Sequence, residues 1–465
     1  MAHYDLVIIG TGSGNSILNA QFADRTVAIV EKGTFGGTCL NVGCIPTKMF
    51  VHAADVARSA ETSTELGVDA ELRGVRWADM RDRIFGRIDP ITEGGLDYRR
   101  DHPDNANVTV YQGVGRFVGH KTLNVAPNDG GIPEVITADR FVLAAGSRAT
   151  VPDIPGLSDV DYHTSDTIMR IDKLPASVII LGSGFVAAEF AHVLSSFGAD
   201  VTMVARSEAL LRGQDEHISA RFTDLATQRW DVRLGRSTVA ARRTESGIAL
   251  DLAGKESTET VEAELLLIAT GRVPNADLLN VAATGVSTTA DGYVEVDGFQ
   301  RTSVDGIYAL GDICSPHQLK HVANHEARVV RHNLLHPESP TKTDRRFVPH
   351  AVFTSPQIAS VGLTEQEARE RGVSYVTATQ NYADIAYGWA MEDTAGFAKL
   401  LADPVTGQLI GAHILGPQAP TLIQPIIQAM SFGLDARTMA RGQYWIHPGM
   451  SELVENALLN LPLAA

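Results

Sequence analysis

Two glycine-rich turns, each preceded by a short apolar run, constrain the fold of this chain more than any other feature. The first run, Tyr4–Ile9, leads into such a turn, and a second run, Thr26–Val30, ends in Glu31. The first turn contains Gly10, Gly12 and Gly14. Strand, glycine turn, helix, strand and terminal acid form the pattern of a dinucleotide-binding βαβ unit, in which the acid bonds a ribose hydroxyl. Asn15 departs from this pattern, since it takes the place of the third glycine.

The second turn, Gly182-Ser183-Gly184, follows the strand-like run Ser177–Leu181 and precedes a helical pattern and another strand. Ala205 stands where an NAD site would usually place an acid, and Arg206 and Arg212 follow it. A ribose 2′-phosphate is repelled by a carboxylate and attracted by guanidinium groups. The residues after the second glycine turn therefore favour NADPH over NADH. Ordinary surface arginines are the alternative interpretation.

These units predict an α/β fold of several domains, because 465 residues exceed a single hydrophobic core. We expect two Rossmann-like dinucleotide-binding domains and a C-terminal α+β domain. The boundaries are placed at 1–150 and 273–338 for the first domain, 151–272 for the second, and 339–465 for an interface domain that forms a dimer.

Composition excludes several classes of protein. A hydrophobic content of 44% with 20% charged residues is typical of a globular protein. The net charge of −16 argues against a nucleic-acid partner, which would require a basic face. The first apolar run is too short for a signal or membrane helix, and three cysteines fit a reducing compartment. We therefore expect a cytoplasmic protein without a membrane partner.

Two of the three cysteines, Cys39 and Cys44, stand in one short segment with Gly43 and Pro46. In a regular helix their Cα atoms would lie roughly 8–9 Å apart, whereas a disulfide needs about 4.4–6.8 Å. A bridge therefore requires a distorted turn, which the glycine and the proline allow. A strained, partly exposed cysteine pair is better suited to reversible oxidation and reduction than to a permanent structural disulfide. Two unrelated thiols are the alternative; a zinc site lacks a second cysteine pair, so no metal is expected.

Two later segments carry weaker signals. His447 precedes Pro448, and Glu452 begins a helix close enough to orient the imidazole. A histidine held in this way can transfer a proton to or from a thiol near neutral pH, although a structural histidine is the commoner case. Asp312 follows Gly311 at the end of a strand-like run, where an aspartate is usually a turn residue or helix cap.

Taken together, the two nucleotide units, the segment Gly36–Pro46, the late Gly311-Asp312 and the terminal His447–Glu452 resemble the FAD-dependent pyridine nucleotide–disulfide oxidoreductases over nearly the whole chain. Four stretches are similar to the actinobacterial members that reduce mycothione, in which Asn15 is expected. These stretches are Gly10–Leu18, Asp161–Asp166, Tyr387–Asp393 and Gln443–Pro448.

The resemblance implies an NADPH-dependent flavoprotein that reduces a low-molecular-weight disulfide, here mycothione, through a Cys39–Cys44 bridge. Cys44 is expected next to the flavin, and Cys39 is expected to attack the substrate. His447 and Glu452 would complete the active site of the partner in a homodimer. Lys48, one helical turn after Cys44, would reach the flavin edge with Glu189 as its partner.

The same resemblance implies a set of cofactor contacts. For FAD these are Gly10, Gly12, Ser13, Gly14, Glu31, Lys32, Gly37, Thr38, Cys39, Lys48, Gly115, Ala145, Gly146, Asp312 and Lys320. For NADPH they are Gly182, Gly184, Arg206, Arg212 and Gly271. An NAD-dependent dihydrolipoamide dehydrogenase and a glutathione-type reductase are the alternatives among enzymes. A flavin-binding scaffold without catalysis is the alternative from another class.

Overall fold

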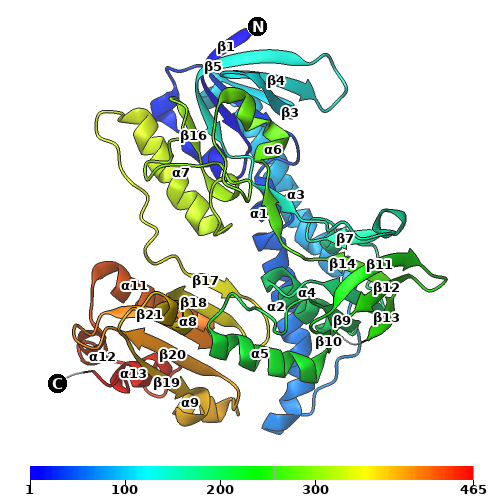
Figure 1. Ribbon diagram of the computed structural model, residues 1–465, viewed down its shortest axis with the longest axis vertical. Coiled ribbons are helices and arrows are strands. Elements are labelled where there is room, and N and C mark those ends of the chain that lie inside the picture. Colours follow the sequence, from blue (N-terminus) through cyan, green and yellow to red (C-terminus); the bar gives the residue numbers. More distant parts are fainter. Residues whose placement is uncertain (256, 464–465) are drawn as a thin grey trace. The chain divides into compact units, whose positions relative to one another are not determined.

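The computed structural model describes residues 1–255 and 257–463, so the last two residues of the predicted interface domain lie outside the described part. Most of its helices and strands are labelled in Figure 1. Two compact units can be separated: residues 1–47, 78–150 and 271–344 form the first, and residues 48–77, 151–270 and 345–465 form the second.

A parallel sheet forms the core of the first unit. Its strand order is β3 (Val108–Gly119), β2 (Val27–Glu31), β1 (Ala2–Ile9), β5 (Glu134–Leu143) and β16 (Ile307–Ala309). β4 (Thr122–Pro127) pairs antiparallel with the C-terminal part of β3 and with the N-terminal part of β5. Every residue of β2 is buried, as expected for a β-branched run covered on both faces. The pattern of two strands around a glycine turn is therefore confirmed.

The helix expected after the first glycine turn is not an α-helix, and this expectation was wrong. Two short 3-10 turns replace it, Ser13–Ile17 and Ala20–Phe22. Arg99, near the end of α3 (Trp77–Asp101), donates from Nη2 to the carbonyl oxygens of Asn15 (3.0 Å) and Leu18 (3.4 Å). Those two carbonyls thus accept hydrogen bonds from a residue outside the turns.

The remaining elements of the first unit surround this sheet. They are α1 (Gly37–Asn41), the start of α2 (Cys44–Thr62), most of α3, β6 (Ser147–Ala149), β15 (Arg272–Pro274), α6 (Ala276–Leu279) and α7 (Lys320–Leu335). β6 and β15 form a short antiparallel pair. α2 and α3 both continue across the division between the units, with residues 48–77 belonging to the second.

The second unit contains the second dinucleotide-type sheet, in which all pairings are parallel. Its order is β10 (Asp231–Arg233), β9 (Asp200–Val204), β8 (Ser177–Leu181), β14 (Leu265–Ile268) and β7 (Tyr162–Thr164). α4 (Phe185–Ser196) connects β8 to β9, and α5 (Glu216–Arg229) connects β9 to β10. An antiparallel sheet that the sequence did not predict follows: β11 (Ser237–Arg243), β12 (Ile248–Ala253) and β13 (Thr258–Ala263).

The C-terminal region is an α+β domain, as expected. Its antiparallel sheet has the order β17 (His350–Val352), β18 (Ile358–Gly362), β21 (Leu409–Leu415), β20 (Phe397–Ala402) and β19 (Val376–Asn381). The helices are α8 (Glu365–Glu370), α9 (Ala386–Ala390), α10 (Ala419–Leu422), α11 (Gln424–Phe432), α12 (Ala436–Arg441) and α13 (Glu452–Leu459). None of the described helices is both long and apolar enough to span a membrane.

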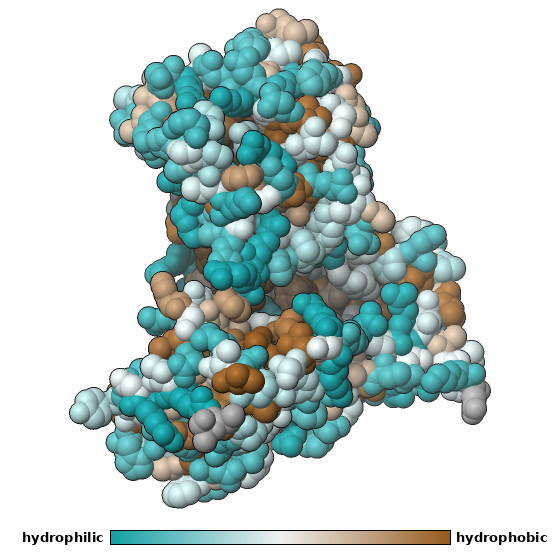
Figure 2. Space-filling view, turned by 60° about the vertical axis from the view of Figure 1, so that its left-hand side comes forward, coloured by the Kyte–Doolittle hydropathy of each residue, from teal (hydrophilic) through white to brown (hydrophobic). Residues whose placement is uncertain are grey.

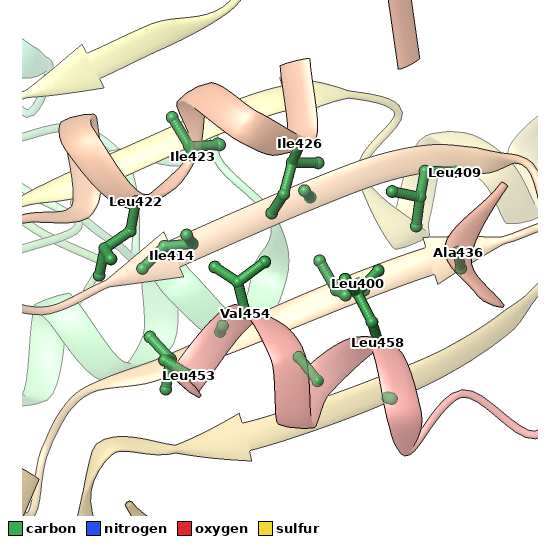
Figure 3. Close-up of a cluster of buried hydrophobic side chains, with 14 of the residues drawn as sticks. Leu400, Leu409, Ile414, Leu422, Ile423, Ile426, Ala436, Leu453, Val454 and Leu458 are labelled. Atoms are coloured by element: carbon green, nitrogen blue, oxygen red, sulfur yellow. The ribbon is translucent and has the colours of Figure 1, made fainter. Parts of the chain in front are cut away.

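α13 is held by its apolar face. Leu453, Val454 and Leu458 point toward Leu400 and Ile414 of the sheet, and all five side chains are at most 2% exposed (Figure 3). Burying a side chain of this size contributes about 1.5–3 kcal/mol. The packing therefore fixes the first turn of α13, where Glu452 lies.

Candidate active site

The helical segment that contains the two cysteines is interrupted between them. α1 ends at Asn41, Val42 takes φ −142°, and α2 begins at Cys44. A Cβ on Gly43 would lie 2.9 Å from the carbonyl oxygen of Thr38 and 3.3 Å from Cα of Cys39. Only glycine permits this approach, so the distortion predicted from the spacing is present at this position.

No disulfide joins Cys39 and Cys44, and their side chains share a hydrogen bond. That hydrogen bond, together with burial of Cys39, raises the pKa of the Cys39 thiol, while the nearby charge of Lys320 acts in the opposite direction. Cys39 is half-buried and Cys44 is exposed. Two thiols in hydrogen-bond contact can close to a disulfide by losing two electrons and two protons.

Asn41 fixes the segment between the thiols and was missed by the sequence interpretation. Its side-chain amide donates to the carbonyl oxygens of Phe35 (2.9 Å) and Gly37 (3.0 Å), and its oxygen accepts from the Thr92 hydroxyl at 2.7 Å. The residue is only 4% exposed. A buried, fully bonded amide holds α1 in one conformation. Its place inside the cysteine segment was the only signal available in the sequence.

The first glycine turn forms a cradle of backbone. A Cβ on Gly37, which has φ +72°, would lie 2.7 Å from Cα of Gly12, whereas a Cβ on Gly12 would meet no atom within 4 Å. Glu31 receives hydrogen bonds from the Thr11 amide (2.8 Å) and, through its other oxygen, from the Gly33 amide (2.8 Å). Close glycine backbones beside an open space fit the pyrophosphate of a dinucleotide such as FAD.

Other predicted cofactor contacts belong to the same unit. Lys320 donates from Nζ to the Ser13 hydroxyl at 2.9 Å. Asp312 accepts a hydrogen bond of 2.7 Å from Ser147, and the Ala145 carbonyl accepts one of 2.8 Å from Asn275. Gly10, Gly14 and Gly146, which were predicted for FAD, also belong to this unit. So does Gly271, which was predicted as an NADPH contact of the second domain. Gly10, Gly146 and Gly271 have positive φ.

Three predicted contacts have a less specific environment. Gly115 is buried in β3, where a Cβ would lie 3.3 Å from side chains of Leu123 and Val30. Lys32 and Thr38 are exposed. The contacts of Gly115 show a packing reason for a glycine, and a role of these three residues toward a cofactor stays a prediction.

Lys48 and Glu189 form the ion pair that was expected. Lys48 Nζ lies 2.5 Å from Glu189 Oε2, and the other carboxylate oxygen accepts from the Phe353 amide at 2.9 Å. The ammonium group also lies 4.4 Å from the centroid of the Phe353 ring. Glu189 has a side chain only 7% exposed, and its two carboxylate oxygens bind the Lys48 ammonium group and the Phe353 amide. α2 carries this lysine one turn after Cys44.

The second glycine turn also approaches other backbone closely. A Cβ on Gly182, φ +147°, would lie 2.2 Å from the carbonyl oxygen of Ala269. Gly184 caps α4 with φ −86° and ψ −173°, and a Cβ there would meet nothing within 4 Å. Arg206 and Arg212 are exposed, and no carboxylate of the described residues pairs with either. Both guanidinium groups are available to an anionic ligand.

Gly184→Ala is expected to weaken the binding of either pyridine nucleotide at least about tenfold, since the methyl group would occupy the space left for a pyrophosphate. The backbone of Gly184 lies in the extended region that alanine adopts, so the thermal midpoint should stay equal or rise slightly. Steady-state kinetics with both coenzymes and a melting curve test this. Unchanged KM values in a folded variant would contradict the assignment.

His447 and Glu452 meet as predicted. His447 Nδ1 lies 2.6 Å from Glu452 Oε1, and the Gly449 amide donates to Glu452 Oε2 at 3.2 Å. The hydrogen bond from His447, followed by that from Gly449, lowers the pKa of Glu452. The carboxylate therefore accepts a hydrogen from Nδ1 and leaves Nε2 for proton transfer. The imidazole is 71% exposed.

Hydrophobic side chains reach the surface of the same C-terminal domain (Figure 2). Those most exposed there include Trp389 (64%), Phe432 (83%), Tyr444 (104%) and Ile446 (78%). Tyr444 and Ile446 lie within three residues of His447. Exposed aromatic and aliphatic side chains beside a candidate catalytic group are typical of a surface that another chain covers.

The chain is similar to known proteins along almost its whole length. Residues 4–327 match the family described as pyridine nucleotide-disulphide oxidoreductase, and residues 348–458 match the dimerisation domain of that family. The chain is 55% identical to mycothione reductase of Mycobacterium tuberculosis, over 99% of this chain and 100% of that protein. It is 32% identical to dihydrolipoyl dehydrogenase of Corynebacterium glutamicum, over 98% of this chain and 97% of that protein.

A solved structure has the same fold. The flavoprotein disulfide reductase RclA from Escherichia coli, as its Cu(II) complex, superimposes with a TM-score of 0.85 at 27% sequence identity, covering 99% of both chains. The similarity thus extends over both nucleotide-type sheets and the C-terminal domain. It agrees with the α/β architecture expected from the two glycine turns.

Proposed function

Since the chain belongs to the pyridine nucleotide-disulphide oxidoreductase family, we propose that it is an NADPH-dependent reductase whose substrate is mycothione, the disulfide of mycothiol. It is an oxidoreductase that acts on sulfur groups and uses FAD and a pyridine nucleotide. One observation carries the proposal: the Cys39 and Cys44 side chains are in hydrogen-bond contact on a segment whose helix is interrupted at Gly43. The choice of mycothione is supported by the 55% identity to an enzyme of that name.

Cys39 and Cys44 act in sequence in the proposed reaction. His447 takes the proton of the Cys39 thiol, and the resulting thiolate attacks one sulfur of the substrate. This forms a mixed disulfide and releases the first thiolate, which takes that proton back from His447. The Cys44 thiolate then attacks the sulfur of Cys39, which releases the second thiolate and closes the Cys39–Cys44 bridge. FAD, when bound, supplies the two-electron transfer from the pyridine nucleotide that reopens this bridge.

Charged residues of the chain assist these steps. Glu452 holds the His447 ring by its Nδ1 and stabilises the imidazolium form. Lys48, whose ammonium group is fixed by Glu189, would supply positive charge beside the FAD ring. We assign Cys39, Cys44, His447 and Glu452 to the sulfur chemistry, and Lys48 and Glu189 to the cofactor.

We propose a homodimer in which His447 of a second copy serves the thiols of the first. The match of residues 348–458 to a dimerisation domain and the exposed hydrophobic residues near His447 support this arrangement. The cytoplasmic location expected from the low cysteine content remains a prediction. A reductase of this kind would keep a low-molecular-weight thiol reduced in the cell.

A comparison of three disulfides tests the substrate. Oxidation of NADPH should be much faster with mycothione than with glutathione disulfide or lipoamide at equal concentration. Fast reduction of either of the other disulfides with slow reduction of mycothione would contradict the substrate. The related dihydrolipoyl dehydrogenase makes lipoamide the most informative competitor.

Arg206→Ala and Arg212→Ala are each expected to raise KM for NADPH by about 10- to 100-fold, since a charge-assisted hydrogen bond contributes about 1.5–3 kcal/mol. kcat/KM for NADH should change little, because NADH has no 2′-phosphate. Steady-state kinetics with both coenzymes measures this. Arg243→Ala, which removes an exposed arginine paired with Asp161, is the control. A wild-type enzyme faster with NADH than with NADPH would overturn the coenzyme assignment.

A further inference from the structure

A row of buried polar side chains crosses the sheet of the C-terminal domain. Ser360 on β18 faces His413 on β21, and His413 faces Lys399 on β20. Their exposed fractions are 2%, 0% and 1%. The next residues along these strands, including Val361 and Ala398, belong to the apolar core. Burial of polar groups, and above all of a lysine, costs free energy unless partners compensate. These three side chains therefore need hydrogen-bonding or ionic partners.

These partners come from the residue pair Gln214-Asp215, immediately before α5. Both oxygens of Asp215 accept hydrogen bonds from Lys399 Nζ, at 2.8 and 2.9 Å. Gln214 Oε1 lies 2.9 Å from the Ser360 hydroxyl, which donates to it, and 3.0 Å from His350 Nε2. Asp215 is fully buried, and Gln214 is 8% exposed. The chain is thereby fixed to the sheet at this point.

Glu365 completes the attachment from α8. Its backbone amide donates to Asp215 Oδ2 at 3.0 Å, and its own carboxylate lies 2.6 Å from Lys399 Nζ. Asp215 also caps α5, accepting from the His217 amide at 3.1 Å. The lysine thus balances two carboxylates, and the start of α5 has one position relative to the sheet.

The segment that ends at this attachment is residues 206–213, here called the arginine loop, which carries Arg206 and Arg212. The amide of Leu211 donates to the carbonyl of Ser183 in the second glycine turn at 2.8 Å. The Ser219 hydroxyl of α5 donates to the Leu210 carbonyl at 2.6 Å. Leu211 has φ +51°, a left-handed conformation that costs a non-glycine residue free energy and persists only where neighbours hold it.

We propose that the buried polar row positions the arginine loop for the 2′-phosphate of NADPH, and so determines the coenzyme preference from a distance; this rests on the NADPH dependence proposed above. Lys399 and Asp215 are positioning residues, because side chains that are 1% and 0% exposed cannot touch a coenzyme. Support of the fold alone would not require an ion pair, since well-packed apolar residues serve that purpose as well or better.

Lys399→Met provides the test, with Val361→Ala as the matched control. The methionine keeps the length of the side chain but leaves Asp215 without its cation, so KM for NADPH should rise at least about tenfold while kcat stays within about twofold. kcat/KM for NADH should stay within about twofold, as the loop serves only the 2′-phosphate. Val361→Ala destabilises the same sheet from its apolar face and should leave both KM values unchanged.

A second measurement and a milder variant complete the test. Calorimetry should show weaker binding of adenosine 2′,5′-bisphosphate to the Lys399→Met holoenzyme, with binding of 5′-AMP unchanged. Gln214→Met keeps the ion pair, removes only the acceptor for Ser360 and His350, and should raise KM for NADPH by about threefold. If Lys399→Met does not fold, the KM of Gln214→Met for NADPH decides whether the buried polar row positions the arginine loop.

The outcomes separate this inference from the proposed coenzyme. A wild-type enzyme that prefers NADH would overturn both. A wild-type enzyme that prefers NADPH, with variants that lose only thermal stability or lose affinity for both coenzymes equally, would overturn the positioning role alone. A selective loss of NADPH affinity in Lys399→Met or Gln214→Met, absent from Val361→Ala, would establish it.

Discussion

Replacing Cys39 by serine should lower the rate of disulfide reduction by at least about three orders of magnitude, because a serine hydroxyl at neutral pH cannot replace a thiolate as the attacking nucleophile. Bound FAD should still be reduced by NADPH, since Cys44 and both glycine turns are unchanged. Stopped-flow spectroscopy would follow the flavin, and steady-state assays would follow NADPH oxidation with the disulfide.

Cys314→Ser is the matched control. Cys314 is the third thiol of the chain, 6% exposed, and it contacts the Gly311 carbonyl and the Gln300 amide. We expect this variant to retain activity within about twofold per bound FAD, because a buried cysteine with those neighbours behaves as a small packing residue. Near-normal disulfide reduction by Cys39→Ser would show that our role for Cys39 is wrong.

Replacing His447 by alanine should lower turnover by about 10²- to 10⁴-fold, the range that a positioned general acid or base contributes. The loss should be largest for substrates whose leaving thiol has a high pKa, as those need the proton most. FAD reduction by NADPH should again stay normal. Glu452→Gln keeps a hydrogen-bond acceptor for Nδ1 and should have a smaller effect than His447→Ala.

The pH dependence of the pair has a defined sign. The pKa of Glu452 is lowered in the folded protein, chiefly by the hydrogen bond from His447. A carboxylate with a lowered pKa stabilises the fold above its unfolded pKa of about 4.3, and that contribution is lost as the pH falls through the folded value. Glu452 therefore stays ionised at neutral pH, and a rate change in that range cannot come from its titration.

Mixing two inactive variants tests whether the histidine acts across a dimer. Equal amounts of Cys39→Ser and His447→Ala chains, exchanged to equilibrium, should recover roughly one quarter of the wild-type activity, since half of the dimers are mixed and each has one intact site. No recovery, with exchange shown by mass spectrometry of differently labelled chains, would mean that both residues act within one chain.

The parts of the site that the sequence predicted share one property: the residues lie close together along the chain. The glycine turns follow strands within a few residues, and Cys39, Gly43 and Cys44 belong to one segment. His447 and Glu452 are separated by a single turn and the start of a helix. In these cases backbone geometry over a few residues limits what the side chains can meet.

The features that the sequence interpretation predicted wrongly or missed depend on residues that lie far apart along the chain. The α-helix expected after the first glycine turn is replaced by 3-10 turns, and the Asn15 carbonyl in them accepts a hydrogen bond from Arg99, 84 residues away. Asn41, which fixes the cysteine segment, depends on Thr92 at a separation of 51 residues. Lys48 and Glu189 are 141 residues apart, and their pairing was expected only from the family resemblance.

By itself, the sequence determined the two dinucleotide-type units, the redox segment and the histidine–carboxylate pair, because each depends on backbone conformations that glycine and proline permit locally. Tertiary structure alone decided which distant side chains hold those features in place, above all the contact between Lys399 and Asp215 across 184 residues. Such a contact forms only when two elements pack together and exclude water from both charges, and no local pattern of residues encodes that event.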